Sequence, residues 1–248
     1  MQVISEFVDV KGAAGSIRCL TCKPKGVARA PAVVAWSDIF QLTPAHTRMV
    51  QRLAGHGFLV VAPELYARFE PAGTVLDFDK DRARAIADSD RVVVSELDAD
   101  VQAVVDYVEH RPDVDHARIG AVGWCFGGHV AFRAALLPEI KAAACCYGTG
   151  IHNGKLGACD GAATSAGSLE RAKELKGELL LVWGRNDPHI PAEGRAKIHR
   201  ALDDAGIRYE ARLYDAEHTF MRDEGNRWDP DAADRAFGAV VGLFKRSL

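Results

Sequence analysis

The clearest chemical signal in the chain is a cysteine among glycines, in Gly123-Trp124-Cys125-Phe126-Gly127-Gly128. An apolar run, 119–122, precedes this segment, and a helix-like run, 129–137, follows it. A G-x-nucleophile-x-G segment between a strand and a helix makes a sharp turn that exposes its central side chain above the sheet. Small neighbours tolerate the strained backbone, and the first N–H groups of the helix point at whatever binds there. The pattern therefore predicts a covalent nucleophile at the cysteine.

The alternative interpretation is a small-residue turn around a buried cysteine, because free cysteine is among the most buried residue types. A nucleophilic thiol differs in needing a base, which in turn needs an orienting group. In this architecture the acid and then the histidine follow the nucleophile, on loops after later strands. Asp187 follows the apolar run 179–183, and His218 follows a run that ends at Tyr214. Both residues are thus expected at the carboxyl ends of strands, where open α/β sheets bind ligands.

Other residues near these two are reserve candidates for the same roles. His189 lies close to Asp187 in the sequence and is the reserve base. Glu217 and Asp215 are reserve acids, although their proximity to His218 along the chain makes good orientation harder. Taken alone, an aspartate before a proline could form a turn, and the histidine could lie on the surface. The complete set of three residues is more specific than any one of them.

Short apolar runs alternate with longer amphipathic segments along the whole chain. The predicted strands are 6–10, 17–22, 32–36, 59–62, 118–122, 142–147, 179–183 and 208–214. The predicted helices are 44–55, 81–94, 95–109, 127–137, 192–205 and 231–245. Several strands are nearly continuous in Val, Ala, Leu and Ile, which is typical of strands covered on both faces. The alternation predicts an α/β fold, with a mostly parallel sheet of about eight strands and helices on both faces.

Two features refine this organisation. No helix separates the first two predicted strands, which favours an antiparallel hairpin at one edge of the sheet. The loop 148–167 is long and rich in Gly, Ala, Ser and Thr, so we expect a surface flap or an ordered loop near the site. The chain shows no repeat and no clear linker, and we expect residues 1–248 to form a single domain.

The composition restricts the classes of function. The 248 residues are 48% hydrophobic and 26% charged, as in ordinary globular domains. A formal net charge of -3 without a basic run argues against nucleic acid and membrane surfaces as partners. We expect neither a membrane span nor a signal peptide. Six cysteines are too sparse for a disulfide scaffold, and no ligand spacing indicates a metal. The sequence therefore predicts a cytoplasmic protein that needs no metal or organic cofactor.

Five short segments next to the predicted strands carry a likeness to a known family. They are Asp38-Ile39-Phe40, Pro63-Glu64-Leu65-Tyr66-Ala67-Arg68, Gly123-Trp124-Cys125-Phe126-Gly127-Gly128, Gly184-Arg185-Asn186-Asp187 and Ala216-Glu217-His218-Thr219-Phe220. Through them the chain resembles the dienelactone hydrolase family, a branch of the α/β-hydrolase fold. The resemblance extends over most of the chain, roughly residues 33–244. The cysteine turn and the L-Y-A-R segment after a strand are together its most specific marks.

The resemblance implies a role for each of the residues singled out above. Cys125 would be the nucleophile, His218 the base and Asp187 the carboxylate that orients the base. The backbone N–H groups of Ile39 and Phe126 would form the oxyanion hole. Two such donors matter because they stabilise charge that develops only in the transition state.

The family's substrates are lactones that carry a carboxylate, formed in the breakdown of plain or chlorinated aromatics. The resemblance therefore implies a small anionic ester or lactone as the substrate of this chain. Arg84 and Arg222 match the family's substrate-binding arginines, and a guanidinium offers a planar fork that suits a carboxylate. A solvated surface arginine is the alternative, most of all for Arg84, which begins a charged helix.

Two positions depart from the family pattern. Asp38 stands where the family has a glutamate that lies beside the resting thiol and takes its proton when substrate binds. The shorter aspartate leaves activation more dependent on a thiolate–imidazolium pair between Cys125 and His218. Asp88 stands where the family often has a tyrosine near the substrate. Together with the loop 148–167, these departures predict a pocket unlike that of the family.

We therefore predict a hydrolase that cleaves a dienelactone-type lactone or ester through an acyl-thioester on Cys125. One alternative is a broader carboxylesterase or thioesterase that acts on neutral esters. Another is a non-catalytic protein that binds a ligand or senses redox state with the same fold. The complete set of nucleophile, acid and base argues against this last alternative, because a binding protein has no need for all three.

Overall fold

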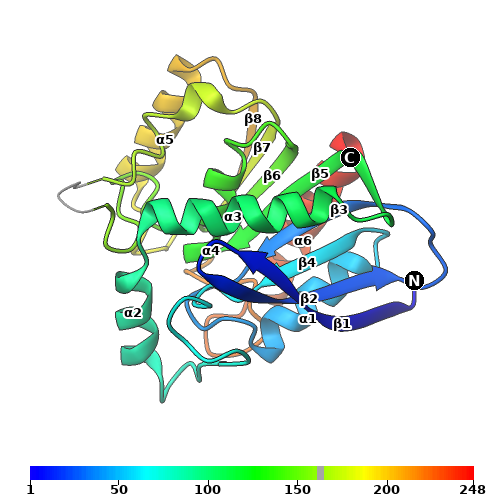
Figure 1. The fold of residues 1–248 in the computed structure, drawn as a ribbon. Helices are drawn as coiled ribbons and strands as arrows, with labels where there is room; N and C mark the ends of the chain where they lie inside the picture. The colour runs from blue at the N-terminus through cyan, green and yellow to red at the C-terminus, as the bar shows by residue number, and fades with distance from the viewer. Residues whose placement is uncertain (161–164) are drawn as a thin grey trace.

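The computed structural model describes residues 1–160 and 165–248, and its strands form one eight-stranded sheet (Figure 1). In chain order the strands are β1 (Val3–Gly12), β2 (Gly15–Pro24), β3 (Ala30–Trp36), β4 (Leu59–Pro63), β5 (Val114–Trp124), β6 (Ile140–Cys146), β7 (Glu178–Gly184) and β8 (Tyr209–Tyr214). Their order across the sheet is β1-β2-β4-β3-β5-β6-β7-β8. β2 pairs antiparallel with β1 and β4, and every other pairing is parallel. The predicted α/β class and the antiparallel edge hairpin are confirmed.

Helices cover both faces of the sheet (Figure 1). They are α1 (Pro44–Ala54), α2 (Arg82–Arg91), α3 (Val94–Glu109), α4 (Phe126–Ala134), α5 (Ala192–Asp204), α6 (Pro230–Ser247) and the short 3-10 helix η1 (Ala172–Glu174). α2 ends earlier than its predicted range because Val92 has an extended backbone, with φ -61° and ψ 124°. The carbonyl of Val92 accepts a hydrogen bond from the Ala158 N–H at 2.8 Å, so this residue belongs to a loop contact. The amphipathic pattern does not predict η1.

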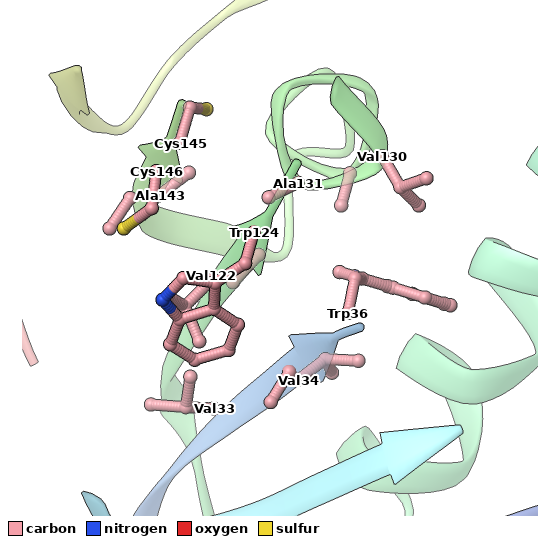
Figure 2. Packing of buried hydrophobic residues seen from close by; sticks show 14 of the residues in the cluster. Val33, Val34, Trp36, Val122, Trp124, Val130, Ala131, Ala143, Cys145 and Cys146 are labelled. Carbon is pink, nitrogen blue, oxygen red and sulfur yellow. The ribbon is translucent and has the colours of Figure 1, made fainter. Parts of the chain in front are cut away.

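The core lies on both faces of the central strands. All five residues of β4 are buried, as are six of the seven residues of β3. Trp36 is in register with Gly123 on β5, so the next residue, Trp124, projects from the opposite face. Figure 2 shows the two indole rings on either side of the sheet, with Val130 and Ala131 of α4 nearby. Apolar side chains on both faces thus hold rigid the strand ends from which the functional loops leave.

Within the described residues, no helix combines the length and apolar character needed to cross a lipid bilayer.

Candidate active site

Cys125 lies on a strained turn between β5 and α4, with φ 58° and ψ -121°. Positive φ is unusual for a residue with a side chain and indicates stored strain. The flanking glycines make the turn sterically feasible. A Cβ at Gly123 would lie 1.8 Å from the carbonyl oxygen of Gly127, and a Cβ at Gly127 would lie 2.2 Å from that of Ser37. The turn therefore has the geometry that the glycine spacing predicts.

A chain of hydrogen bonds joins Cys125, His218 and Asp187. Cys125 Sγ is 3.1 Å from Nε2 of His218, and Nδ1 of the same ring is 2.7 Å from Oδ2 of Asp187. The other oxygen of this carboxylate accepts the His189 backbone N–H at 2.8 Å. The imidazole and the carboxylate are buried, whereas the thiol is half-buried. The structure thus brings together three residues that the sequence separates, each on a loop that follows a parallel strand.

The charges around His218 set the protonation state of its ring. Burial opposes a charged His218, but the adjacent Cys125 charge and the Asp187 hydrogen bond outweigh it and raise the pKa of His218 to about 10. This pKa favours the imidazolium form of His218 at neutral pH. The rings of Tyr147 and His189 contact His218 edge to face, with centroids 5.3 and 4.7 Å away, and restrict its orientation.

Ile39 and Phe126 lie beside Cys125 at the same cavity. Phe126 is the first residue of α4, where helix N–H groups have no partner within the helix. Within the described part of the chain, the Ile39 N–H has no hydrogen-bond acceptor. The Tyr66 hydroxyl donates to the Ile39 carbonyl at 3.1 Å and fixes this peptide. Two backbone donors are thus available near the thiol. Tyr66 belongs to the L-Y-A-R segment, the only sequence signal for its supporting role.

The thiol opens into a cavity of about 990 Å³. The loop after β6 contributes Thr149, Gly150, Asn153, Lys155 and Gly157, and α2 contributes Arg82, Ile86, Ser89 and Asp90. The described part of the predicted loop 148–167 therefore lines the site, while its residues 161–164 lie outside the described residues. Among the residues that the structure describes, no group of three or more His, Cys, Asp or Glu side chains could hold a metal ion.

Asp38 and Arg222 face each other in this cavity. Oδ2 of Asp38 is 3.6 Å from Nη1 of Arg222, and Oδ1 accepts the Phe40 N–H at 3.0 Å. Burial raises the pKa of Asp38, against the effects of the Phe40 N–H and Arg222. The Arg222 guanidinium also lies 3.7 Å from the centre of the Phe78 ring, a cation–π contact. The carboxylate of Asp38 is thus engaged by Arg222 and a backbone N–H rather than by the thiol.

Arg84 does not line the cavity, contrary to the role that the family resemblance implies. Its Nη2 lies 2.5 Å from Oε2 of Glu70, and its Nε lies 3.9 Å from Oδ2 of Asp88. Asp88 is buried in this cluster, where burial and then the Glu70 charge raise its pKa. Residues two apart on a helix face different sides, and Arg82 lines the cavity in place of Arg84. Helix orientation, which the sequence leaves open, decides between the two arginines.

The reserve candidates occupy different positions. His189 lines the cavity beside His218, whereas its own ring makes no hydrogen bond within the described residues. Glu217 is exposed and lies 3.4 Å from Arg227. Asp215 accepts a hydrogen bond from a neighbouring asparagine at 3.2 Å. Of the three carboxylates considered for the acid, Asp187 is thus the one bonded to the His218 ring.

Comparisons with known proteins identify relatives of this chain. The model of the "Dienelactone hydrolase family" matches residues 17–248. A Saccharomyces cerevisiae protein named "Putative carboxymethylenebutenolidase" is 32% identical over all of this chain and 93% of its own length. A carboxymethylenebutenolidase from a Pseudomonas species is 28% identical over 96% of this chain and 93% of its own length.

A solved structure shows the same fold. The Klebsiella pneumoniae protein named "Putative Dienelactone Hydrolase" superposes with a TM-score of 0.85 at 22% identity, over 99% of this chain and all of its own. Its likeness concerns the fold, whereas the family match and the yeast relative concern the sequence. The chain therefore belongs to the dienelactone hydrolase family and has the α/β-hydrolase fold.

Proposed function

We propose that this protein hydrolyses a lactone or ester of the dienelactone type, with Cys125 as nucleophile. One observation carries the proposal: an unbroken hydrogen-bonded chain runs from the Asp187 carboxylate through the His218 ring to a half-exposed thiol at a cavity. A structural cysteine has no need of an oriented base or of access to a cavity. The carboxymethylenebutenolidase relatives support the substrate class.

The first half of the reaction forms a thioester. The Cys125 thiolate attacks the carbonyl carbon, and the N–H groups of Ile39 and Phe126 bind the oxygen that becomes negative. Collapse of this intermediate breaks the bond between the carbonyl carbon and the ring or leaving-group oxygen. His218 donates its Nε2 proton to that oxygen as a general acid. The acyl group remains bonded to sulfur.

The second half releases the acid. The now neutral His218 takes a proton from water as the resulting hydroxide attacks the thioester carbonyl. The carbon–sulfur bond breaks, and the thiolate and imidazolium are restored. Asp187 holds the ring through Nδ1, so that Nε2 faces the reacting atoms throughout. A dienelactone would give an open-chain, maleylacetate-like product.

Hydrolysis of cis- and trans-dienelactone, measured beside p-nitrophenyl acetate, tests the proposal. We expect turnover of at least one lactone in the wild-type protein and its loss in Cys125→Ala. Intact mass spectrometry during turnover should show an acyl adduct on the wild-type protein and none on the variant. Unchanged activity in Cys125→Ala would contradict the mechanism. Absence of turnover together with an unreactive thiol would favour a non-catalytic role.

A second candidate function is hydrolysis of neutral esters, which the pairing of Arg222 with Asp38 favours. An arginine already held by a carboxylate has less capacity to bind the carboxylate of a substrate. Turnover of p-nitrophenyl acetate without turnover of either lactone would support this function and retain Cys125 as the nucleophile.

A further inference from the structure

The strand β8 forms one end of the sheet, opposite β1, and its outer edge is open (Figure 1). Within the described residues β8 pairs only with β7, in register along its whole length. An edge strand offers a row of N–H and C=O groups that can pair with another strand. Proteins that avoid such pairing place a proline, a lysine or a bulge there, and β8 has none of these. The edge is therefore available for strand addition.

The side chains of β8 alternate between two faces of the sheet. Glu210 and Arg212 share the face that α6 covers, where Glu210 lies 3.6 Å from a guanidinium of that helix. Tyr209 and Leu213 share the opposite face, where the Tyr209 hydroxyl donates to Asp203 of α5 at 2.9 Å. Leu213 is 41% exposed. One face of the edge thus carries two opposite charges, and the other carries an exposed apolar side chain.

A second copy of β8 can pair with this edge in only a few registers. Two identical edges related by a two-fold axis run antiparallel, and their outward N–H and C=O groups belong to alternate residues. Opposing residues are then an even number of positions apart in the sequence, so each register has one residue that faces its own copy. The two registers that pair the most residues of β8 are centred on Ala211 and on Arg212.

The charges of the strand distinguish these two registers. Pairing centred on Arg212 places two guanidinium groups directly opposite each other, and like charges at such positions destabilise a strand pair. Pairing centred on Ala211 places Glu210 opposite the partner's Arg212, and the two-fold axis repeats this contact. Arg212 also donates to Glu210 within one chain, so the four side chains form a ring of alternating charges. The charge order of β8 therefore complements itself in the register centred on Ala211.

The opposite face supports the same register. Pairing centred on Ala211 places Leu213 opposite the partner's Tyr209, again twice. Leu213 then leaves water and packs against an aromatic ring, a favourable combination across antiparallel strands. The small side chain of Ala211 allows close approach at the centre. Both faces of the edge are thus complementary in one arrangement.

We propose that β8 is a homodimer interface, at which two copies of this chain pair antiparallel about Ala211 and join their sheets. The occupant is a second copy of this chain because the sequence of the edge matches itself in charge and in apolar contact. None of the described residues that line the cavity belongs to β8, so the interface uses no residue of the proposed active site. His218 is on the loop that leaves the end of β8, and the pairing holds the strand from which this loop starts.

Charge reversal tests the register. Sedimentation velocity of the wild-type chain at micromolar to sub-millimolar concentrations should show a dimer. Glu210→Arg and Arg212→Glu each place like charges opposite each other and should raise the Kd of the dimer by at least about tenfold. An equimolar mixture of the two variants restores both opposite-charge pairs and should dimerise as the wild type does. The double variant Glu210→Arg/Arg212→Glu should likewise dimerise by itself.

A cross-link reads the centre of the pairing directly. Opposing Cα atoms in antiparallel strands are about 4.5–5.5 Å apart, within the range that a disulfide spans. Mild oxidation should therefore link two chains of Ala211→Cys, and should leave Leu213→Cys unlinked because Leu213 faces the partner's Tyr209. Both variants carry Cys125→Ala, which removes the half-buried thiol. Asp9→Arg changes a charge on β1, the other edge, and should leave the Kd unchanged.

The outcomes separate this interface from others. A wild-type chain that stays monomeric over the whole concentration range overturns the proposal. A dimer that persists in both single charge variants, or that is lost in Asp9→Arg alone, places the interface elsewhere and also overturns it. Circular dichroism verifies the fold of each variant. Where a charge variant fails to fold, the cross-link of Ala211→Cys still decides, and its absence contradicts the register.

Discussion

Two buried histidines in this protein each place Nε2 beside a side chain with a potential nucleophile. His218 Nε2 is 3.1 Å from Sγ of Cys125, and His129 Nε2 is 2.7 Å from Oγ of Ser168. His129 is on α4, one turn after the cysteine itself. On distance alone, the serine pair is the closer one. A comparison of the two arrangements shows which features beyond distance make a histidine a base.

The first difference is the group on the other ring nitrogen. Nδ1 of His218 faces the Asp187 carboxylate, whereas Nδ1 of His129 is 2.9 Å from the carbonyl oxygen of Thr149. Burial and then the Arg133 charge lower the pKa of His129 to about 3, so this ring stays neutral. The pKa of His218 is instead raised to about 10. A neighbouring anion thus stabilises one charged ring, and a neighbouring cation opposes the other.

The second difference is access. Cys125 lines the cavity, whereas Ser168 is fully buried and does not. Arg133 donates to the serine hydroxyl at 2.9 Å, so this oxygen connects a helix to the loop after β6. A buried histidine beside a potential nucleophile is therefore the proposed catalytic pair in one place and a structural connection in the other. We expect substitutions to separate the two arrangements by activity and by stability.

The largest expected effect is the loss of ester hydrolysis in Cys125→Ala. Removal of a nucleophile lowers kcat by about 10⁴-fold or more, because binding and the oxyanion hole remain without covalent chemistry. Steady-state kinetics with p-nitrophenyl acetate measures it. Cys22→Ala, on β2 and outside the residues that line the cavity, is a matched control and should retain full activity. Residual turnover in Cys125→Ala that disappears when Ser168→Ala is added would show that the serine, and not the cysteine, is the nucleophile.

Asp187→Asn should lower kcat/KM by up to about 10⁴-fold, because the carboxylate of a nucleophile–His–Asp triad holds the imidazole in the productive tautomer. Its pH profile is the more specific readout. The wild-type rate should fall as pH rises through about 10, where His218 loses the proton that it gives to the leaving group. Loss of the carboxylate lowers the pKa of His218, so this limb should move to lower pH.

The same proton affects stability. Because the folded-state pKa of His218 lies above its ordinary value of 6.5, its contribution to stability is complete below about pH 6.5 and is lost as pH rises through about 10.

Asp215→Asn, at an exposed reserve acid, is the control for Asp187→Asn and should leave the pH profile of kcat/KM unchanged. An alkaline limb that stays near pH 10 in Asp187→Asn would separate Asp187 from the protonation of the ring.

The sequence alone predicts the strands and the three proposed catalytic residues, for a physical reason. Cys125 and Asp187 each follow an apolar run that forms a buried strand, whereas His218 follows β8, which has no buried residue. All three strands are parallel and bring their carboxyl ends to one edge of the sheet. The central strands are recognisable because residues buried on both faces leave a continuous apolar signal. The edge strands β1 and β8 have few or no buried residues and lack this signal. Strand ends differ by a few residues, where pairing continues into polar sequence, as at the start of β5.

The remaining parts depend on rotations and loop paths that leave no such signal. Arg84 and Arg82 differ by two positions, and only the orientation of α2 decides which reaches the cavity. His129 looks like an ordinary helical residue until the loop after β6 places Thr149 and Ser168 against it. Both cases require the tertiary structure, because each depends on a contact between segments that the sequence pattern does not join.

His129→Gln should reduce stability rather than catalysis. The substitution disturbs hydrogen bonds to the Thr149 carbonyl and the Ser168 hydroxyl, and an unsatisfied buried polar group costs about 1–3 kcal/mol. Urea denaturation at pH 7 measures this loss, and kcat/KM of the remaining folded protein should stay near the wild-type value. A stable but inactive His129→Gln protein would place the residue in the reaction.

The wild-type ring also predicts a pH effect of opposite sign to that of His218. The pKa of His129 is depressed to about 3, so the unfolded state binds a proton at higher pH than the folded state does. Its effect is absent above about pH 6.5, and stability falls progressively as pH drops from there towards 3. In His129→Gln this part of the acid sensitivity should disappear, which a denaturation series between pH 7 and 4 would show.

Ser168→Ala gives the smallest expected effect and tests most directly whether the His129–Ser168 pair takes part in the reaction. Without the hydroxyl, Arg133 still donates to the Ala166 carbonyl at 2.6 Å and to the Asp98 carboxylate, so its charge stays paired. The substitution removes the hydrogen bonds of the hydroxyl to Arg133 and to His129. The loss should therefore lie at the low end of about 1–3 kcal/mol, with unchanged kcat/KM for esters. A loss of activity at wild-type stability would show that the buried hydroxyl acts on the reaction, and that lack of access does not exclude a role. The expected result gives Ser168 a structural role only. Its hydroxyl lies beside a neutral histidine and a cation and is buried away from the cavity, so it has neither an activated base nor access to substrate.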